Sequence, residues 1–232
     1  PDVERERPII IEEINMCWDS PQHRVDQIGD ELLWPGQPLG REIAGSKETV
    51  GSINHSMMMD YAGRRYRPNN AVVAVAGNVL PEEVERAVGE RLADWEPKKS
   101  PDGFPAFDVK GTPHVRIEHR TTEQVNLCLG IKGVSAAHPD RFRMDLLNAV
   151  LGEGMSSRLF ARIREEKGLA YDIHSSTSHF IETGSLNVYA GVEPKRLREA
   201  LAAILEELAL LKTDITEAEV TKAREMSKGR LL

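Results

Sequence analysis

The chain has 232 residues, enough for one large domain or two small ones. Hydrophobic residues make up 40% and charged residues 29% of the sequence, the proportions of an ordinary soluble globular protein. The net charge is −7 and basic residues are interspersed with acidic ones, so the basic stripe that nucleic-acid binding requires is missing. The longest apolar run, 71–76, is too short to cross a bilayer. We therefore expect neither a nucleic-acid nor a membrane partner.

The two ends of the sequence have the character of interior sequence. Residues 1–7 begin inside or just before a helix, and 217–232 form a helical pattern without a cap or a stop signal. We expect the chain to be a piece of a longer polypeptide. No charged-then-apolar leader opens the sequence, and on this basis we expect a bacterial cytoplasmic protein.

The first part of the chain is predicted to be mostly helical. An apolar run at 71–76 indicates one buried strand within it. Apolar residues at helical spacing predict helices, in chain order, for 2–18, 22–34, 49–66 and a segment that begins at Pro81.

The rest of the chain is predicted to combine strands and helices. Alternating apolar and polar residues predict paired strands at 114–120 and 124–132 and a hairpin of 171–180 with 185–190. Helices are predicted for 140–151, for the segment after the glycine turn at 152–154, for a stretch that begins at Pro194, and for a last stretch from Ile215.

An internal sequence repeat suggests two related domains. Residues 72–87 and 186–200 both read as a strand, an Ala-Gly pair, a short loop, a proline at the start of a helix and an amphipathic helix. The segment 97–113 between them is rich in proline and glycine and is the expected linker. We expect an α+β fold with two related, incomplete domains, 1–96 and 114–232, each an antiparallel or mixed sheet packed with helices.

Two carboxylates stand out on the first helix. Glu6 and Glu13 lie seven residues apart, and therefore on one helical face, which also carries Ile9, Ile10 and Cys17. Carboxylates on an apolar face are costly unless they are paired, hydrogen-bonded or bound to a metal. They fit either structural ion pairs with a buried arginine or part of a metal site. Pro8 requires the helix to begin near that residue or to kink.

A second candidate feature lies between Gly152 and Tyr171. The sequence reads as a glycine turn, a short helix, a glycine stop and a strand, with Arg164 and Tyr171 seven residues apart across the stop. An arginine and a tyrosine in such positions could bind a peptide carbonyl or carboxylate. Taken alone, Arg164 also fits the flank of an ordinary helix and Tyr171 a packed strand residue.

The sequence resembles the pitrilysin/insulinase-type zinc peptidases, and among these the compact bacterial members similar to mitochondrial processing peptidase. The resemblance covers nearly the whole chain in order. It is carried by the stretches 4–14, 38–41, 66–78, 154–160 and 164–171. This family has an inverted zinc motif, H-x-x-E-H, with a glutamate as third ligand well downstream. The resemblance implies that Glu13 is this zinc ligand and that Glu6 supports the site without touching the metal.

The same resemblance implies a zinc metalloendopeptidase that cleaves extended or unfolded peptides with a metal-activated water. Tyr171 would hydrogen-bond the substrate carbonyl, and Arg164 would anchor substrate backbone or a carboxylate. The H-x-x-E-H segment does not occur in the sequence, so the two histidine ligands are missing and the chain alone is expected to be inactive. The resemblance further implies a homodimer or a paired subunit. Two alternatives are a non-catalytic partner or core-type subunit of the same fold and an unrelated α+β binding module.

Overall fold

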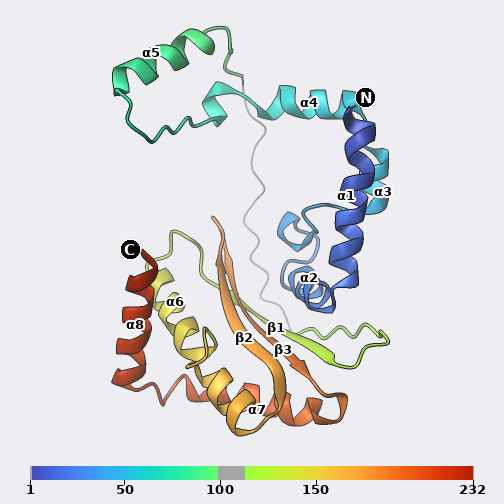
Figure 1. The fold of residues 1–232 in the computed structure, drawn as a ribbon, viewed down its shortest axis with the longest axis vertical. Helices are drawn as coiled ribbons and strands as arrows, with labels where there is room; N and C mark the ends of the chain where they lie inside the picture. Colours follow the sequence, from blue (N-terminus) through green and yellow to red (C-terminus); the bar gives the residue numbers. More distant parts are fainter. Residues whose placement is uncertain (1, 99–112, 232) are drawn as a thin grey trace. The chain divides into compact units, whose positions relative to one another are not determined.

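The computed structural model describes residues 2–98 and 113–231 (Figure 1). These residues form two compact units: 2–12 with 46–98, and 13–45 with 113–231. Helix α1 (Asp2–Asp19) contributes to both and runs through Pro8. The second unit thus includes 13–45, which the sequence assigned to the first domain. The expected linker 97–113 falls almost entirely outside the described residues.

The first unit has helices but no strand among its described residues. The single helix predicted for 49–66 is two helices, α3 (Lys47–Ser52) and α4 (His55–Arg65). They are separate because Asn54 is extended and its side chain accepts the Met57 N–H at 3.0 Å, which caps a new helix. A 3₁₀ turn, η2 (Pro68–Asn70), and α5 (Pro81–Arg91) complete the unit.

The buried strand predicted for 71–76 is wrong for this structure. The segment is not paired, and its side chains are exposed, with Val72 94% accessible. The apolar pattern indicates burial, but strand formation also needs a neighbouring backbone to accept its hydrogen bonds. The described residues supply none there.

The second unit contains the sheet. Its strands β1 (Val125–Gly133), β2 (Ala170–His179) and β3 (Gly184–Val192) form one antiparallel sheet in the order β1-β3-β2. The predicted hairpin of β2 with β3 is confirmed. The predicted pairing of 114–120 with 124–132 is wrong, because β1 pairs with β3 instead. The described chain therefore has one sheet-bearing α+β domain, not two.

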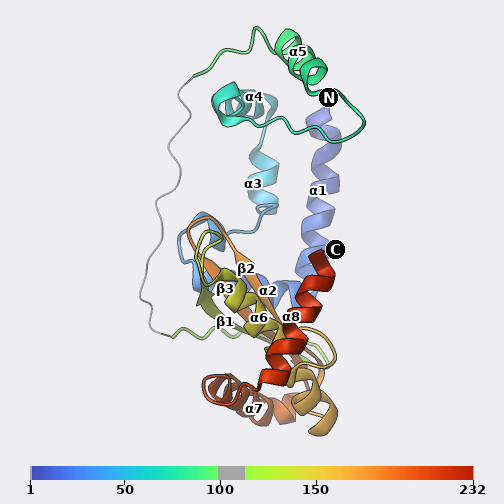
Figure 2. The ribbon, with the colours of Figure 1, turned by 90° about the vertical axis from the view of Figure 1, so that its left-hand side faces the viewer.

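Helices cover one face of this sheet with an apolar core. These are α6 (Arg141–Leu151), the π-helix η3 (Leu159–Glu166), α7 (Leu197–Leu210) and α8 (Glu217–Leu231). A short 3₁₀ turn, η4 (Pro194–Arg196), starts α7 as the proline predicts. Figure 2 shows α6 in front of the strands. The central strand β3 contributes Val188, Ala190 and Val192, all fully buried, to this core.

Helix α2 (Pro21–Leu33) packs against β1 from the other face. Leu127 and Leu129 contact the apolar core, so Cys128 between them faces α2. The contact layer is polar: Asp26 and Asp30 of α2 lie near Cys128. Burial raises the pKa of Asp30 to about 6, with a contribution from Asp26 and Glu42, and burial raises the pKa of the Cys128 thiol to about 12. This thiol is accordingly a packing group and not a nucleophile.

The segment 113–120 lies against α2 through charged side chains. Arg24 is buried and donates to Glu118 at 3.0 and 2.7 Å, while Arg120 donates to the same carboxylate at 2.8 Å. The guanidinium groups of both arginines lie over the Trp18 ring. The polar side chains of the predicted strand thus bind a helix, which explains why this segment does not join the sheet.

Helix α8 is attached to the core by a second charged contact. Arg158 is 5% exposed and donates to Glu219 through Nε at 2.6 Å and Nη2 at 2.8 Å, and it also donates to the carbonyl of Asp214. Thr216 caps the helix because its hydroxyl accepts the N–H of Glu219 at 3.3 Å, and the hydroxyl also donates to the Glu219 carboxylate at 2.9 Å. The hydrogen bond from Arg158 lowers the pKa of Glu219 to about 2.

None of the helices in the described part of the chain has an apolar stretch long enough to span a bilayer.

The Arg158–Glu219 pair predicts acid sensitivity. Glu219 has a lower pKa folded than unfolded, so its contribution is complete above the unfolded value and is lost as pH falls from about 5 toward 2. Glu219→Gln should lower the free energy of unfolding at pH 7 by about 3 kcal/mol, because it leaves a buried guanidinium without its partner. Denaturant unfolding measures both effects. Glu217→Gln, in the exposed first turn of α8, is the control, and equal losses in both variants would refute the assignment.

The buried carboxyls Asp26 and Asp30 of α2 predict that stability rises, and does not fall, as the solution becomes mildly acidic. A carboxyl whose folded pKa is raised destabilises the folded state when it is ionised, so stability should rise as pH falls from 7 toward 5. Asp30→Asn should raise the free energy of unfolding at pH 7 by about 1 kcal/mol and flatten this rise. Glu182→Gln, in the exposed hairpin turn, should do neither. Thermal unfolding over this pH range tests the prediction, and an unchanged slope in Asp30→Asn would contradict it.

Candidate functional site

The segment that carries Arg164 begins at a close contact between α6 and β2. Gly152 caps α6, and its carbonyl accepts the N–H of Ser175 at 3.1 Å. A Cβ at Gly152 would lie 2.4 Å from Ser175 Oγ and 2.5 Å from Ser175 N, so only glycine permits this approach. The contact fixes where the chain leaves α6 before the next helix.

The predicted helix after the glycine turn exists, but it is a π-helix. It spans Leu159–Glu166, and the N–H of Lys167 bonds to the carbonyl of Arg162 at 3.2 Å, five residues back. Leu159 and Ile163 face the core and are fully buried. π-helices are rare, occur mostly as single-turn bulges inside α-helices, and are frequent at functional sites. An α-helical spacing of side chains, which the sequence predicted, is therefore replaced by a wider one.

Two arginines hold this π-helix to its neighbours. Arg158, which precedes its first residue, pairs with Glu219 of α8. Arg162 donates to both carboxylate oxygens of Glu207 of α7 at 2.9 and 3.1 Å, and Glu207 is only 6% exposed. Both contacts are charge-assisted and involve a buried partner, so they fix the helix strongly. Neither ion pair is expected from the sequence pattern.

Arg164 differs from these two arginines. It is exposed, its guanidinium lies 4.7 Å from the centre of the Phe160 ring, and its only ion pair among the described residues is with the adjacent Glu165 at 3.8 Å. An arginine held by an aromatic ring and not by a carboxylate of another element keeps its donors available to a ligand.

Tyr171 lies at an irregularity of strand β2. Ala170 pairs with Val192 and Asp172 with the next residue of β3, Gly191, so Tyr171 is an extra residue in the ladder. Such a β-bulge re-aims side chains and is common beside active sites. Regular alternation would place Tyr171 on the same face as the buried Ile173, but the bulge leaves its ring 61% exposed.

A short turn joins the two candidate residues. Gly168 has a φ of +56°, a left-handed conformation that favours glycine, and the N–H of Leu169 bonds to the carbonyl of Ile163 at 2.9 Å. The structure therefore places Arg164 and Tyr171 on either side of a tight connection, both open to solvent. No hydrogen bond joins their side chains in the described part of the chain.

The carboxylates of α1 are placed differently from the expectation. No residue of α1 is buried, and Glu6 and Glu13 are both exposed, so the apolar interior expected around them is not present. Glu6 lies 3.7 Å from Arg5, and Glu13 has no ion pair within the described residues. The described residues contain no group of three side chains that could hold a metal ion. One carboxylate does not provide the three protein ligands of a catalytic zinc site.

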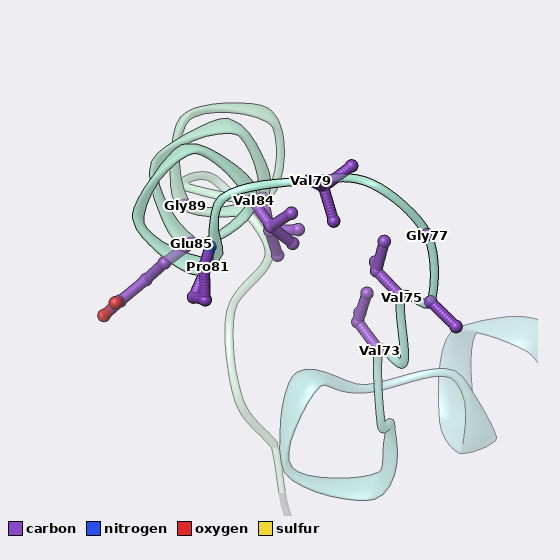
Figure 3. Close-up of a pocket in the computed structure, with 10 residues that line it drawn as sticks. Val73, Val75, Gly77, Val79, Pro81, Val84, Glu85 and Gly89 are labelled. Carbon is purple, nitrogen blue, oxygen red and sulfur yellow. The ribbon is translucent and has the colours of Figure 1, made fainter.

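The first unit contains a hollow of about 680 Å³ between residues 73–79 and α5 (Figure 3). Its walls are mainly valine side chains, among them Val73, Val75 and Val84, and Glu85 points away from it. Its lining is apolar apart from Glu85, which is not the set of convergent polar groups expected of a catalytic site. The Arg164–Tyr171 surface of the second unit is the better candidate site.

Comparison with known proteins identifies the family. Residues 52–227 match the family described as the peptidase M16 inactive domain. The chain is 34% identical to the uncharacterized zinc protease YmxG of Bacillus subtilis, over 100% of the chain and 56% of that protein. It is also 34% identical to an uncharacterized zinc protease of Mycobacterium leprae, over 100% of the chain and 53% of that protein. The chain spans about half the length of these relatives.

Solved structures share the fold. A peptidase M16 inactive domain from Pseudomonas fluorescens has a TM-score of 0.84 at 19% identity, covering 97% of this chain and 55% of that one. A chain of Complex III2 from Candida albicans has a TM-score of 0.81 at 18% identity, covering 98% of this chain and 56% of that one. Because the family match extends over most of the sequence, this chain belongs to the M16 peptidase family and carries its inactive domain.

Proposed function

We propose that this chain is the substrate-binding part of a zinc metalloendopeptidase that cleaves extended peptides. The observation that carries the proposal is the exposure of Arg164 and Tyr171 on a π-helix and a β-bulge, two irregular backbone features held by a rigid core. The names of the relatives, uncharacterized zinc proteases, support the same reaction class.

Each side chain has a defined role in this proposal. The Tyr171 hydroxyl donates to the carbonyl oxygen of the scissile peptide, a contact that strengthens as this oxygen gains negative charge. Arg164 donates to a substrate carbonyl or carboxylate with its planar guanidinium. Strand β2 is an edge of the described sheet, and Gly152 already accepts the N–H of Ser175 on this edge. An extended peptide can therefore add through backbone hydrogen bonds only on the part of β2 that precedes Ser175, next to Tyr171.

Metal binding is assigned to the longer protein and not to this chain. A zinc ion supplies a nucleophilic water at neutral pH when three protein ligands hold it. Glu13 would contribute one ligand, Glu6 would support it, and the two histidines would come from an H-x-x-E-H segment that these 232 residues do not contain. In this proposal 1–96 belongs to the end of the metal-bearing domain. Pairing with a second copy or subunit would complete the peptide-binding site.

The chain alone should bind peptide without cleaving it. Titration of the isotopically labelled chain with an extended peptide should shift the backbone resonances of 164–172, and mass spectrometry should find the peptide intact. Arg164→Ala should weaken binding about tenfold, because charge-assisted hydrogen bonds are lost. Arg198→Ala, which removes an exposed arginine of α7, is the matched control. Equal affinities of both variants, or shifts confined to other regions, would reject this binding surface.

Catalysis is tested in a longer protein that joins these residues to an H-x-x-E-H segment. Tyr171→Phe should lower kcat about 100-fold with little change in KM, because the lost hydrogen bond forms mainly in the transition state. Glu13→Gln should abolish both zinc binding, measured by metal analysis, and cleavage of a quenched fluorescent peptide. Full activity of Tyr171→Phe would refute the carbonyl role, and full zinc occupancy in Glu13→Gln would refute the ligand assignment.

A non-catalytic subunit of the same fold is the second candidate. The likeness to a chain of Complex III2 favours it, since this fold is not confined to proteins named as proteases. The sequence that precedes residue 1 in the longer protein discriminates between the two candidates. An intact H-x-x-E-H there supports the peptidase, and its absence supports the non-catalytic subunit.

A further inference from the structure

The end of the π-helix is held by an arginine from another element. Arg196, at the start of α7, donates through Nη1 to the carbonyl of Gly168 at 2.8 Å and through Nη2 to the carbonyl of Lys167 at 3.3 Å. The same guanidinium lies 3.2 Å from Glu199, one helical turn further along α7. Arg196 thus bridges a carboxylate of its own helix and two backbone carbonyls in the turn between Arg164 and Tyr171.

These carbonyls need a donor. The last carbonyls of a helix have no partner within it, and here the chain turns away at once through the left-handed Gly168. Leu169 and Ala170 are buried immediately afterwards, so the turn cannot relax without moving β2. Arg196 supplies charge-assisted hydrogen bonds to both carbonyls, which sets the path of the chain from the π-helix into the bulge.

We propose that Arg196 is a positioning residue for the Arg164–Tyr171 surface. This inference rests on the proposed function, since it assigns Arg196 to the same peptide site. Arg196 acts through the Lys167–Gly168 turn and does not contact the substrate. Its hydrogen bonds hold Tyr171 at the distance from Arg164 at which one peptide reaches both. The turn has three fixed points: Arg162 on Glu207 before it, Arg196 on its carbonyls, and the buried Ala170 after it.

Hydrogen exchange of the 232-residue chain tests the positioning itself. In Arg196→Ala, the amides of Lys167 and Leu169, which bond to Arg162 and Ile163, should exchange about tenfold faster than in the wild type. The amide of the core residue Val188 should be unaffected. Arg196→Lys keeps the positive charge but can donate to only part of the turn, so its exchange rates at Lys167 and Leu169 should lie between those of the wild type and Arg196→Ala. Arg198→Ala should exchange at the wild-type rates. Unchanged exchange at Lys167 and Leu169 in Arg196→Ala overturns the inference.

Kinetics of the longer, zinc-containing protein tests the consequence. Arg196→Ala should lower kcat about 10-fold with KM nearly unchanged, Arg196→Lys should recover most of this loss, and Arg198→Ala should have no effect. If Tyr171→Phe lowers kcat while Arg196→Ala behaves as Arg198→Ala, the positioning role is refuted and the proposed function stands. If the exchange result holds but Tyr171→Phe has no effect on kcat, the proposed function fails and Arg196 is reduced to a structural contact.

Discussion

The ion pairs between the arginines around the π-helix and two glutamates are the contacts on which the second unit depends. Arg158 with Glu219 and Arg162 with Glu207 join the π-helix to α8 and α7, and each pair contains a partner that is almost completely buried. A π-helix is less favourable than an α-helix of the same sequence, so it persists only where its surroundings fix it. Here the fixed points are charged groups, whose planar guanidinium forks bind carboxylates through two hydrogen bonds.

This rigidity explains how irregular backbone can present side chains reproducibly. The π-helix and the β-bulge each break the regular spacing of their element. Arg164 lies on the first and Tyr171 in the second, and both side chains are exposed. The π-helix and strand β2 both contribute buried residues to the apolar core that α6, α7 and β3 also form. A site built on fixed elements keeps its geometry when a flexible peptide arrives, which reduces the entropy lost on binding.

Sequence patterns predicted the elements whose stability is local. Proline at the start of η4, the glycine-bounded segment at 152–168 and the β2–β3 hairpin are all present, because a proline, a glycine or an alternating pattern acts within a few residues. The apolar segment 71–76 and the alternating segment 114–120 were misread for one reason. Their patterns report which side chains favour burial, whereas a strand also needs a partner backbone that lies far away in sequence. Arg164 and Tyr171 stood out on the glycine-bounded segment and received their roles by resemblance, but neither the π-helix nor the bulge has a signal that spacing could reveal. Glu207 could have been noticed, since it interrupts the apolar face of the α7 pattern.

In the proposed site, Arg164 and Tyr171 contact one peptide together. A crystal structure of the chain, or of the longer protein with its zinc-binding motif inactivated, in complex with an extended peptide would show this contact. We expect a peptide paired with the edge of β2 next to Tyr171, a peptide carbonyl at hydrogen-bond distance, about 2.7–3.2 Å, from the Tyr171 hydroxyl, and the Arg164 guanidinium on the same peptide. A peptide bound elsewhere on the chain, with both side chains still facing solvent, would contradict it.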